Sequence, residues 1–251
     1  MYFSKEDIQL RRDALAAQWD SILNEDEAVL VYSGSTIQKP GGLDQIYPFL
    51  PHPAYYWLTG RRRDDEVVLY SKGTGWVEFQ KPFTNEQAVW EGERNDLLVS
   101  QPGRNVSEIE SYLESQKFTV IYSLGQSMAE MQGKAFELRT MLDQTRRRKD
   151  AAEIRLIKHI AEIAAFGYRE IERVVRPGIS EREIQIAYEG AILRNGGHAM
   201  PYETIIGSGT NSSVLHALPT HKLVEAKELV LVDAGADVYD YCVDITRVFP
   251  S

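Results

Sequence analysis

The sequence predicts two domains of different fold class, an α/β domain over residues 1–145 and an α+β domain over residues 146–251. In the first part, short apolar segments typical of buried strands alternate with helical segments, as in an α/β domain. In the second part, two amphipathic helical segments are followed only by strand-like segments, which favours an α+β domain. The basic run at residues 146–149 separates the two patterns, and we expect it to be a solvated linker rather than a binding patch.

The first domain is expected to begin with a helix and to continue with short strands. Ser4 can cap a helix that extends to about Trp19, because its hydroxyl can accept hydrogen bonds from amides of the first turn. A further helix is expected over residues 106–113. The segments with strand composition lie at residues 28–32, 55–58, 67–70, 75–79 and 118–122.

The second domain is expected to open with two capped helices. Asp150 with Glu153, and Ser180 with Glu183, match the capping-box pattern, in which two side chains satisfy amides of the first turn. The pair Pro177-Gly178 ends the first helix. The apolar face expected for that helix consists of Ile154, Ile157, Ile160, Ala164, Tyr168, Ile171 and Val175. The strands expected after the second helix lie at residues 204–207, 214–218, 228–236 and 241–249.

Composition narrows the class of protein before any motif is considered. The chain is 43% hydrophobic and 26% charged, as in an ordinary globular protein, and its net charge of −9 argues against nucleic acid or an anionic membrane as the main partner. One cysteine, Cys242, leaves no internal disulfide, which fits a reducing compartment. No apolar run reaches membrane-spanning length, and the first residues lack a signal-peptide core. We therefore expect a cytoplasmic protein.

Two aspartates on consecutive strands carry the chemistry that the residues themselves indicate. Asp233 follows four apolar residues, and Asp244 lies on the returning strand. If residues 237–240 form a four-residue loop, the two side chains face each other, with Cβ atoms about 4.5–5.5 Å apart. Carboxylates that close repel unless a cation binds between them, which predicts half of a site for a hard metal ion. A structural role, with one carboxylate capping backbone and the other in solvent, is the alternative.

Several segments resemble one family of enzymes. Residues 233–250, Asp-Ala-Gly followed by Tyr-Cys-Val-Asp-Ile-Thr-Arg-Val-Phe-Pro, resemble the metal-binding hairpin of the aminopeptidase P and prolidase family, metallopeptidases with the pita-bread fold. Residues 148–154 and 207–216 are similar to the start of its catalytic domain and to its histidine-bearing segment, and residues 56–60 resemble its creatinase-like N-terminal domain. The resemblance implies two divalent ions, usually manganese, with Asp233 and Asp244 among their ligands.

The resemblance also implies roles for three further residues. His216, which from its apolar strand-like surroundings would more often be a core residue, becomes a catalytic candidate that contacts the scissile carbonyl or the tetrahedral intermediate. His221 is either a further substrate contact or a surface residue. Trp90 matches a tryptophan that reaches the substrate pocket of a neighbouring subunit, so a homo-oligomer is expected; a core aromatic is the alternative. We expect Cys242 to be a small buried hydrophobe.

The sequence departs from the family pattern in its metal ligands. The family uses five, and the remaining three, a histidine in a His-Gly-x-Gly-His segment and two glutamates, have no match here. We therefore expect these residues to be a fragment that includes only the first part of the pita-bread domain, binds manganese weakly and has negligible peptidase activity alone. The expected function of the complete enzyme is Xaa-Pro aminopeptidase acting on peptides with proline at the second position. The alternatives are an Xaa-Pro dipeptidase, a non-enzymatic pita-bread binding module and metal-free creatinase-like hydrolysis.

Overall fold

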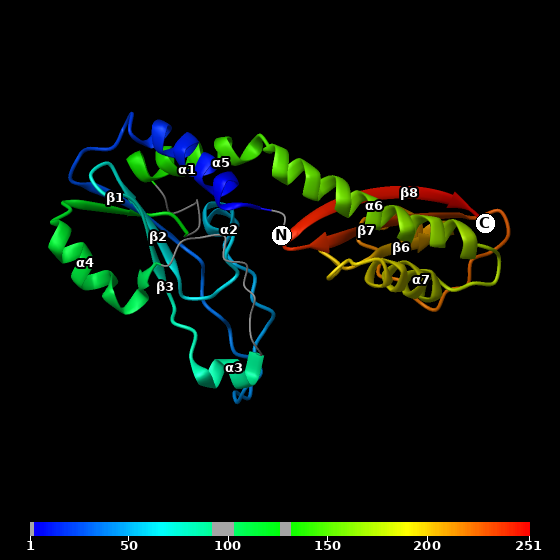
Figure 1. Cartoon of the computed structure of the whole chain (residues 1–251). Helices are drawn as coiled ribbons and strands as arrows, with labels where there is room; N and C mark the ends of the chain where they lie inside the picture. The colour runs from blue at the N-terminus through cyan, green and yellow to red at the C-terminus, as the bar shows by residue number, and fades with distance from the viewer. Residues whose placement is uncertain (1–2, 92–102, 126–131) are drawn as a thin grey trace. The chain divides into compact units, whose positions relative to one another are not determined.

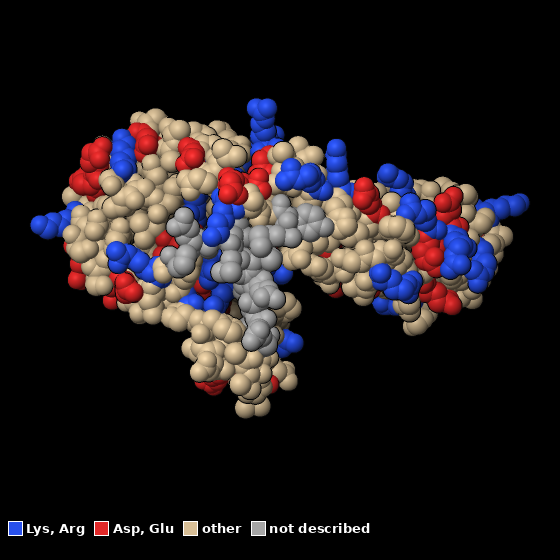
Figure 2. Space-filling view, viewed as in Figure 1, with Lys and Arg blue, Asp and Glu red and all other residues tan. Residues whose placement is uncertain are grey.

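The computed structural model describes residues 3–91, 103–125 and 132–251, and the chain divides into two compact units, residues 1–149 and residues 150–251 (Figure 1). No helix among these described residues is both long enough and apolar enough to cross a membrane. On the face shown in Figure 2, basic and acidic side chains are interspersed over both units rather than gathered into a patch of one sign.

The first unit is built on a mixed five-stranded sheet with strand order β4-β3-β2-β1-β5. β1 pairs antiparallel with β2 and parallel with β5, and β3 pairs antiparallel with β2 and parallel with β4. The strands are β1 (Glu27–Tyr32), β2 (Val67–Ser71), β3 (Gly75–Gln80), β4 (Arg104–Asn105) and β5 (Val120–Ser123). Four of the five expected segments are therefore strands, which confirms the mixed α/β character of this unit.

Alternating side chains of β1 fill a core on each face of this sheet. Val29 and Val31 pack into a cluster with buried residues of α1, α2 and α5, whereas Ala28 and Leu30 pack with Tyr112 of α4 on the other face. The helices of this unit are α1 (Lys5–Trp19), α2 (Pro53–Thr59), α3 (Asn85–Glu91), α4 (Ile109–Gln116, preceded by a 3₁₀ turn at Val106–Glu108) and α5 (Gly133–Arg147). The expected cap of α1 is confirmed, since the Ser4 side chain accepts a hydrogen bond from the Asp7 amide.

Residues 55–58, expected as a strand, form most of helix α2 instead. Pro53 occupies the first turn, the imidazole Nδ1 of His52 accepts the Ala54 amide at 3.2 Å, and Gly60 ends the helix with φ of 67°. Residues 54–59 are all buried, so the segment has no polar face and its sequence shows no helical period. The expected linker is also shorter than predicted, because Arg146 and Arg147 form the last turn of α5.

In the second unit, helices α6 (Ala151–Val174) and α7 (Glu181–Arg194) pack on an antiparallel three-stranded sheet (Figure 1). Both expected capping boxes are present, at Asp150 and at Ser180. The sheet order is β6-β7-β8, and its strands are β6 (Ile205–Ser208), β7 (Leu229–Val238) and β8 (Tyr241–Pro250). Two helices on an antiparallel sheet confirm the expected α+β character of this part.

The two faces of the second sheet differ in burial. Along β7, Val230, Val232 and Ala234 are buried, and they alternate with Leu231 and Asp233, which are only partly buried. The buried stripe of α6 differs from the predicted one: Leu156 is buried where Ile154, expected in the core, is 44% exposed. The helices therefore cover one face of the sheet, and Asp233 points to the other face, which is more open.

Residues 214–218, expected as a strand, form a loop. A 3₁₀ turn over Gly209–Ser213 follows β6 directly, and a Cβ atom at Gly207 would lie 2.6 Å from the carbonyl oxygen of Asn211. The chain therefore folds back too tightly for the strand to continue. Val214 and Leu215 are 54% and 89% exposed and only Ala217 of this apolar run is buried, so the run does not have the alternating buried face of a strand.

Candidate functional site

The β7–β8 hairpin closes through a two-residue turn, not the four-residue loop that was expected. Val238 pairs with Tyr241, and the two residues between them, Tyr239 and Asp240, have φ of 54° and 60°. Positive φ at both central residues is characteristic of the tight type I′ turn. The expected register is consequently wrong by two residues: Asp233 pairs with Thr246, and Asp244 pairs with Gly235.

A shift by two residues keeps both carboxylates on the same face of the sheet, because side chains alternate with a period of two. Asp233 and Asp244 are therefore diagonal neighbours rather than directly opposed. Diagonal side chains are farther apart than opposed ones but still within reach of a shared group. The expectation that the hairpin brings both carboxylates together is thus met by a different register.

The shared group is the hydroxyl of Tyr202, a residue that no sequence pattern marks. It lies 2.8 Å from Asp233 Oδ1 and 3.0 Å from Asp244 Oδ1. Burial raises the pKa of Tyr202, and the hydrogen bonds to the two carboxylates raise it further, so the phenol stays protonated. A phenol has only one proton to donate. The two carboxylates therefore share a single neutral donor.

Gly235 makes room for this arrangement. A Cβ atom at Gly235 would lie 2.2 Å from the carbonyl oxygen of Val243, 2.7 Å from Pro201 Cγ and 3.1 Å from Tyr202 Cε1. The Pro201–Tyr202 segment can cross the hairpin only because this position has no side chain. A glycine inside a strand is the one sequence signal that indicates such a close approach.

His216 lies at the same pocket as the two aspartates. This pocket has a volume of about 360 Å³ and is lined by Tyr202, Glu203, Ile205, His216, Leu218, Asp233 and Asp244. His216 is exposed in the loop after the 3₁₀ turn, so the alternative of a core histidine does not hold. Residues from three segments of the sequence, 202–205, 216–218 and the β7–β8 hairpin, therefore meet at this pocket.

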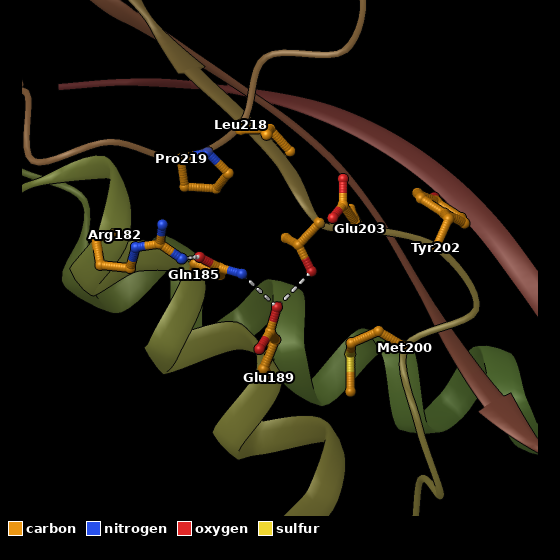
Figure 3. Close-up of a pocket in the computed structure, with 9 residues that line it drawn as sticks. Arg182, Gln185, Glu189, Met200, Tyr202, Glu203, Leu218 and Pro219 are labelled. Atoms are coloured by element: carbon orange, nitrogen blue, oxygen red, sulfur yellow. Dashed lines mark hydrogen bonds between the residues drawn. The ribbon is translucent and has the colours of Figure 1, made fainter. Parts of the chain in front are cut away.

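A second hollow of about 460 Å³ adjoins this pocket and shares Tyr202, Glu203 and Leu218 with it (Figure 3). Its other wall is α7, where Glu189 Oε1 accepts hydrogen bonds from Gln185 Nε2 and Thr204 Oγ1, both at 2.8 Å. The open region beside the two aspartates thus extends toward helix α7.

The other predicted residues lie elsewhere. His221 is exposed and does not line the pocket. Trp90 is 72% exposed on α3 in the first unit, so the alternative of a core aromatic is wrong. Cys242 is exposed, not buried as expected, because it lies on the same open face of β8 as Asp244.

The two aspartates fit a hard divalent cation as part of its ligand set. Carboxylate oxygens are the donors that Mg²⁺, Ca²⁺ and Mn²⁺ prefer. Within the described part of the chain, no Lys or Arg forms an ion pair with Asp233 or Asp244, and one phenol proton cannot neutralise two negative charges. No cluster of three or more His, Cys, Asp or Glu side chains suited to a metal occurs among these described residues.

Each of the two units matches a known protein family. Residues 8–119 match the family model of the aminopeptidase P N-terminal domain, and residues 155–251 match that of metallopeptidase family M24. The Xaa-Pro aminopeptidase of Haemophilus influenzae is 28% identical over 268 residues, covering 98% of this chain and 61% of the relative. A probable Xaa-Pro aminopeptidase of Aspergillus clavatus is 28% identical over 240 residues, covering 88% and 49%.

The fold is likewise that of a solved enzyme. Aminopeptidase P from Escherichia coli with the inhibitor Pro-Leu superposes with a TM-score of 0.77 at 23% identity, covering 99% of this chain and 62% of that one. The architecture is therefore a creatinase-like N-terminal domain followed by part of a pita-bread catalytic domain. The chain belongs to the aminopeptidase P family. It spans 49% and 61% of the length of the two relatives named above.

Proposed function

We propose that the protein is a metal-dependent Xaa-Pro aminopeptidase in which Asp233 and Asp244 are two of the ligands of a pair of divalent ions, with manganese as the native metal. The observation that carries this is the convergence of both carboxylates on the hydroxyl of Tyr202, in a pocket that His216 also lines. The names of the relatives support the reaction class. Divalent ions bound there would act as Lewis acids toward the scissile carbonyl and generate the nucleophile at neutral pH.

The part played by Tyr202 is to hold the two carboxylates in a fixed orientation. Its hydroxyl remains protonated and lies within hydrogen-bond distance of one oxygen of each aspartate, so that the two carboxylates share its single proton. The other oxygen of each carboxylate is then available to a cation. Such outer hydrogen bonds orient the ligands of metal sites and limit their movement when the metal is absent.

The part played by His216 is to donate a hydrogen bond to the carbonyl oxygen of the substrate. A neutral imidazole has one N–H donor, and the exposed position of His216 at the pocket places that donor where a peptide can reach it. Ile205 and Leu218 provide apolar wall beside it, which suits the aliphatic ring of a proline residue. The substrate class is accordingly peptides with proline at the second position.

The test is manganese-dependent release of the first residue from Xaa-Pro-Yaa peptides by the natural gene product that contains this sequence. Asp233→Asn is expected to abolish the activity, because it removes a charged ligand while preserving the shape of the side chain. Asp240→Asn is the matched control, since it removes the same charge from the turn of the same hairpin, where a positive φ of 60° is tolerated by Asn.

The alternatives predict different results in the same assay. Cleavage of Xaa-Pro dipeptides without cleavage of Xaa-Pro-Yaa would favour a dipeptidase. Bound metal without cleavage of either peptide would favour a binding module. Activity that survives both removal of metal and Asp233→Asn would favour metal-free hydrolysis of the creatinase kind.

Three finer expectations belong to the same proposal. We infer a homo-oligomer in which Trp90 contacts a neighbouring subunit, supported by the 72% exposure of this large aromatic side chain. Sedimentation analysis of Trp90→Ala against the unaltered protein tests it, with a smaller assembly expected. A cytoplasmic location is supported by the single cysteine. His221 is retained as a predicted substrate contact.

A further inference from the structure

Glu181, the first residue of α7, is a buried carboxylate with an unusual set of partners. It is 0% exposed. Its Oε1 accepts hydrogen bonds from the backbone N–H of Ser208 at 2.8 Å, from Ser208 Oγ at 2.9 Å and from Asn211 Nδ2 at 3.0 Å. Its Oε2 accepts from the backbone N–H of Thr220 at 3.1 Å and from Thr220 Oγ1 at 2.7 Å. Uncharged donors therefore satisfy a charge that would otherwise be costly to bury.

These five hydrogen bonds join the two ends of one loop. Ser208, the last residue of β6, and Thr220 are the two ends of the loop formed by residues 208–220. The Glu181 carboxylate therefore holds both ends of this loop against the start of α7. A backbone hydrogen bond from Arg182 to the Thr220 carbonyl, 2.9 Å long, supports the same corner. His216 lies between the two ends.

Apolar packing gives the middle of this loop little support. Leu215 is 89% exposed, and Val214 and Leu218 are more than half exposed. Ala217 and Pro219 are buried, and a backbone hydrogen bond of 3.2 Å joins Ile206 to Ala217. The position of the loop therefore depends mainly on polar contacts, of which the Glu181 carboxylate makes the largest share.

We propose that Glu181 is a positioning residue that holds the loop bearing His216 at the Asp233–Asp244 pocket. Its action is indirect, through Ser208, Asn211 and Thr220. The role assigned to His216 rests on the proposed function. The five hydrogen bonds by which Glu181 holds residues 208–220, called the clamp below, do not depend on it.

The geometry makes Glu181→Gln a sharp test. Each carboxylate oxygen accepts one backbone N–H, from Ser208 on one side and from Thr220 on the other. Backbone donors cannot rotate away, so the NH₂ group of a glutamine must face one of them whichever way it is oriented. Burial acts to raise the pKa of Glu181, but the hydrogen bonds from Thr220, Ser208 and Asn211 outweigh it and lower the pKa, so the acceptor is charged at neutral pH.

Glu183→Gln is the matched control. Glu183 lies two residues along the same helix and is exposed, and its carboxylate bonds the amide and hydroxyl of Ser180 in the capping box. Glutamine also serves in a capping box. This variant therefore removes the same charge from the first turn of α7 without touching the loop.

The experiment is hydrogen exchange resolved to individual amides in the metal-free chain. In Glu181→Gln, the amide of Ser208 or of Thr220 is expected to exchange about tenfold faster or more, which corresponds to about 1.4 kcal/mol of local opening free energy. Amides of α6 and of the β7–β8 hairpin should keep their protection, and Glu183→Gln should leave both reporter amides unchanged. Unchanged exchange at both reporters in Glu181→Gln, or equal acceleration throughout the unit, would overturn the proposal.

A second variant decides the matter if Glu181→Gln does not fold. Thr220→Val removes one of the five donors and keeps the shape of the side chain, so it should accelerate exchange at residue 220 and around His216 while the hairpin stays protected. No local change in that variant would overturn the clamp.

Paramagnetic broadening then connects the clamp to the pocket. Added Mn²⁺ should broaden the His216 imidazole signals in the unaltered chain, and Glu181→Gln should reduce that broadening while the Tyr202 ring signals stay broadened. Equal broadening of His216 in both proteins would show that Glu181 does not position it. Absence of broadening even in the unaltered chain would count against the metal site. The hydrogen-exchange results would then decide on their own whether Glu181 holds the loop.

Discussion

The carboxylates of the two units have different kinds of partner. In the N-terminal unit, Glu66 is fully buried and paired with Arg61, whose guanidinium donates two hydrogen bonds of 2.6 and 2.7 Å, while Tyr55 adds a third of 2.7 Å. In the C-terminal unit, Asp233 and Asp244 share one phenol, and Glu181 is bonded by uncharged groups.

The difference separates structural carboxylates from those available for chemistry. A carboxylate that is already paired with a guanidinium has no remaining charge to offer a ligand, and its partner fixes its position. Two carboxylates that converge without a cation have unbalanced charge in a fixed geometry, which is the condition that a divalent ion relieves. We therefore propose that Glu66 contributes to stability and that the Asp233–Asp244 pair serves in binding.

The largest expected effect comes from breaking the paired carboxylate of the N-terminal unit. Arg61→Met removes the guanidinium that hydrogen-bonds the buried Glu66 and leaves only Arg63, whose Nε lies 4.0 Å from Glu66 Oε1. The free energy of unfolding should fall by about 3 kcal/mol, the lower end of the cost of breaking a buried pair. Urea denaturation followed by tryptophan fluorescence measures this change. Arg173→Met, which breaks an exposed pair with Glu170, should leave the denaturation midpoint unchanged. Equal responses of the two variants would contradict the distinction.

In the C-terminal unit, Gly235→Ala should destabilise by about 1–3 kcal/mol, because the added methyl group overlaps Val243 and displaces Pro201 and Tyr202. The same variant should weaken manganese binding. Gly73→Ala is the control, since a Cβ atom there meets nothing within 4 Å. Thermal unfolding with and without Mn²⁺ gives both quantities, and a Gly235→Ala protein as stable as Gly73→Ala would show that the close approach is not needed.

Acid should lower the stability of the N-terminal unit through protonation of His52. Burial, and after it the nearby charges of Arg139 and Arg146, lower the pKa of His52 to about 4, and Asp143 partly opposes them. The folded pKa lies below the ordinary value of 6.5, so the stability this group contributes is present above about pH 6.5 and is lost as the pH falls toward 4. The loss amounts to roughly 2 kcal/mol after allowance for partial exposure.

Protonation would also remove the acceptor that caps α2, since Nδ1 of His52 receives the Ala54 amide. His52→Asn should therefore flatten the dependence of unfolding free energy on pH between 6.5 and 4. His221→Asn, at an exposed position, should leave that dependence as it is. A profile that stays steep in His52→Asn would assign the acid sensitivity to another group.

The smallest stability effect is expected for Tyr202→Phe. Loss of one hydroxyl that donates to charged groups should cost about 1–2 kcal/mol without metal. Its effect on binding should be larger, with manganese affinity reduced about 10–100-fold, as for other groups that orient metal ligands. Titration calorimetry of the variant against the unaltered chain measures both the affinity and the stoichiometry. An unchanged affinity would mean that the phenol does not orient the aspartates.

Local patterns predict much of the fold and point to part of the candidate site. The capping boxes at Asp150 and Ser180 involve residues three apart, so the sequence alone predicts where α6 and α7 begin. Asp233 and Asp244 are singled out by their place on one hairpin, which alone leaves a structural role open, and by the family resemblance of residues 233–250. The register was wrong because Tyr239 and Asp240 lack the Asn-Gly type of signal that marks a two-residue turn.

What the sequence did not predict depends on contacts between distant segments. The bond from Tyr202 to Asp244 joins residues 42 positions apart, and the bond from Thr220 to Glu181 joins residues 39 apart. No periodic pattern marks either partner. Helix α2 was missed for a different reason, because complete burial removed the polar face by which a helix is recognised.

The central claim is that the β7–β8 hairpin provides part of a divalent-cation site, and manganese binding to the 251-residue chain tests it most directly. Electron paramagnetic resonance of free Mn²⁺ should show weak, saturable binding that is lost in both Asp233→Asn and Asp244→Asn and retained in Asp240→Asn. In the absence of metal, the first two variants should be at least as stable as the unaltered chain, because carboxylate repulsion is relieved. Binding that persists in Asp233→Asn and Asp244→Asn, or no saturable binding by the unaltered chain, would contradict the account.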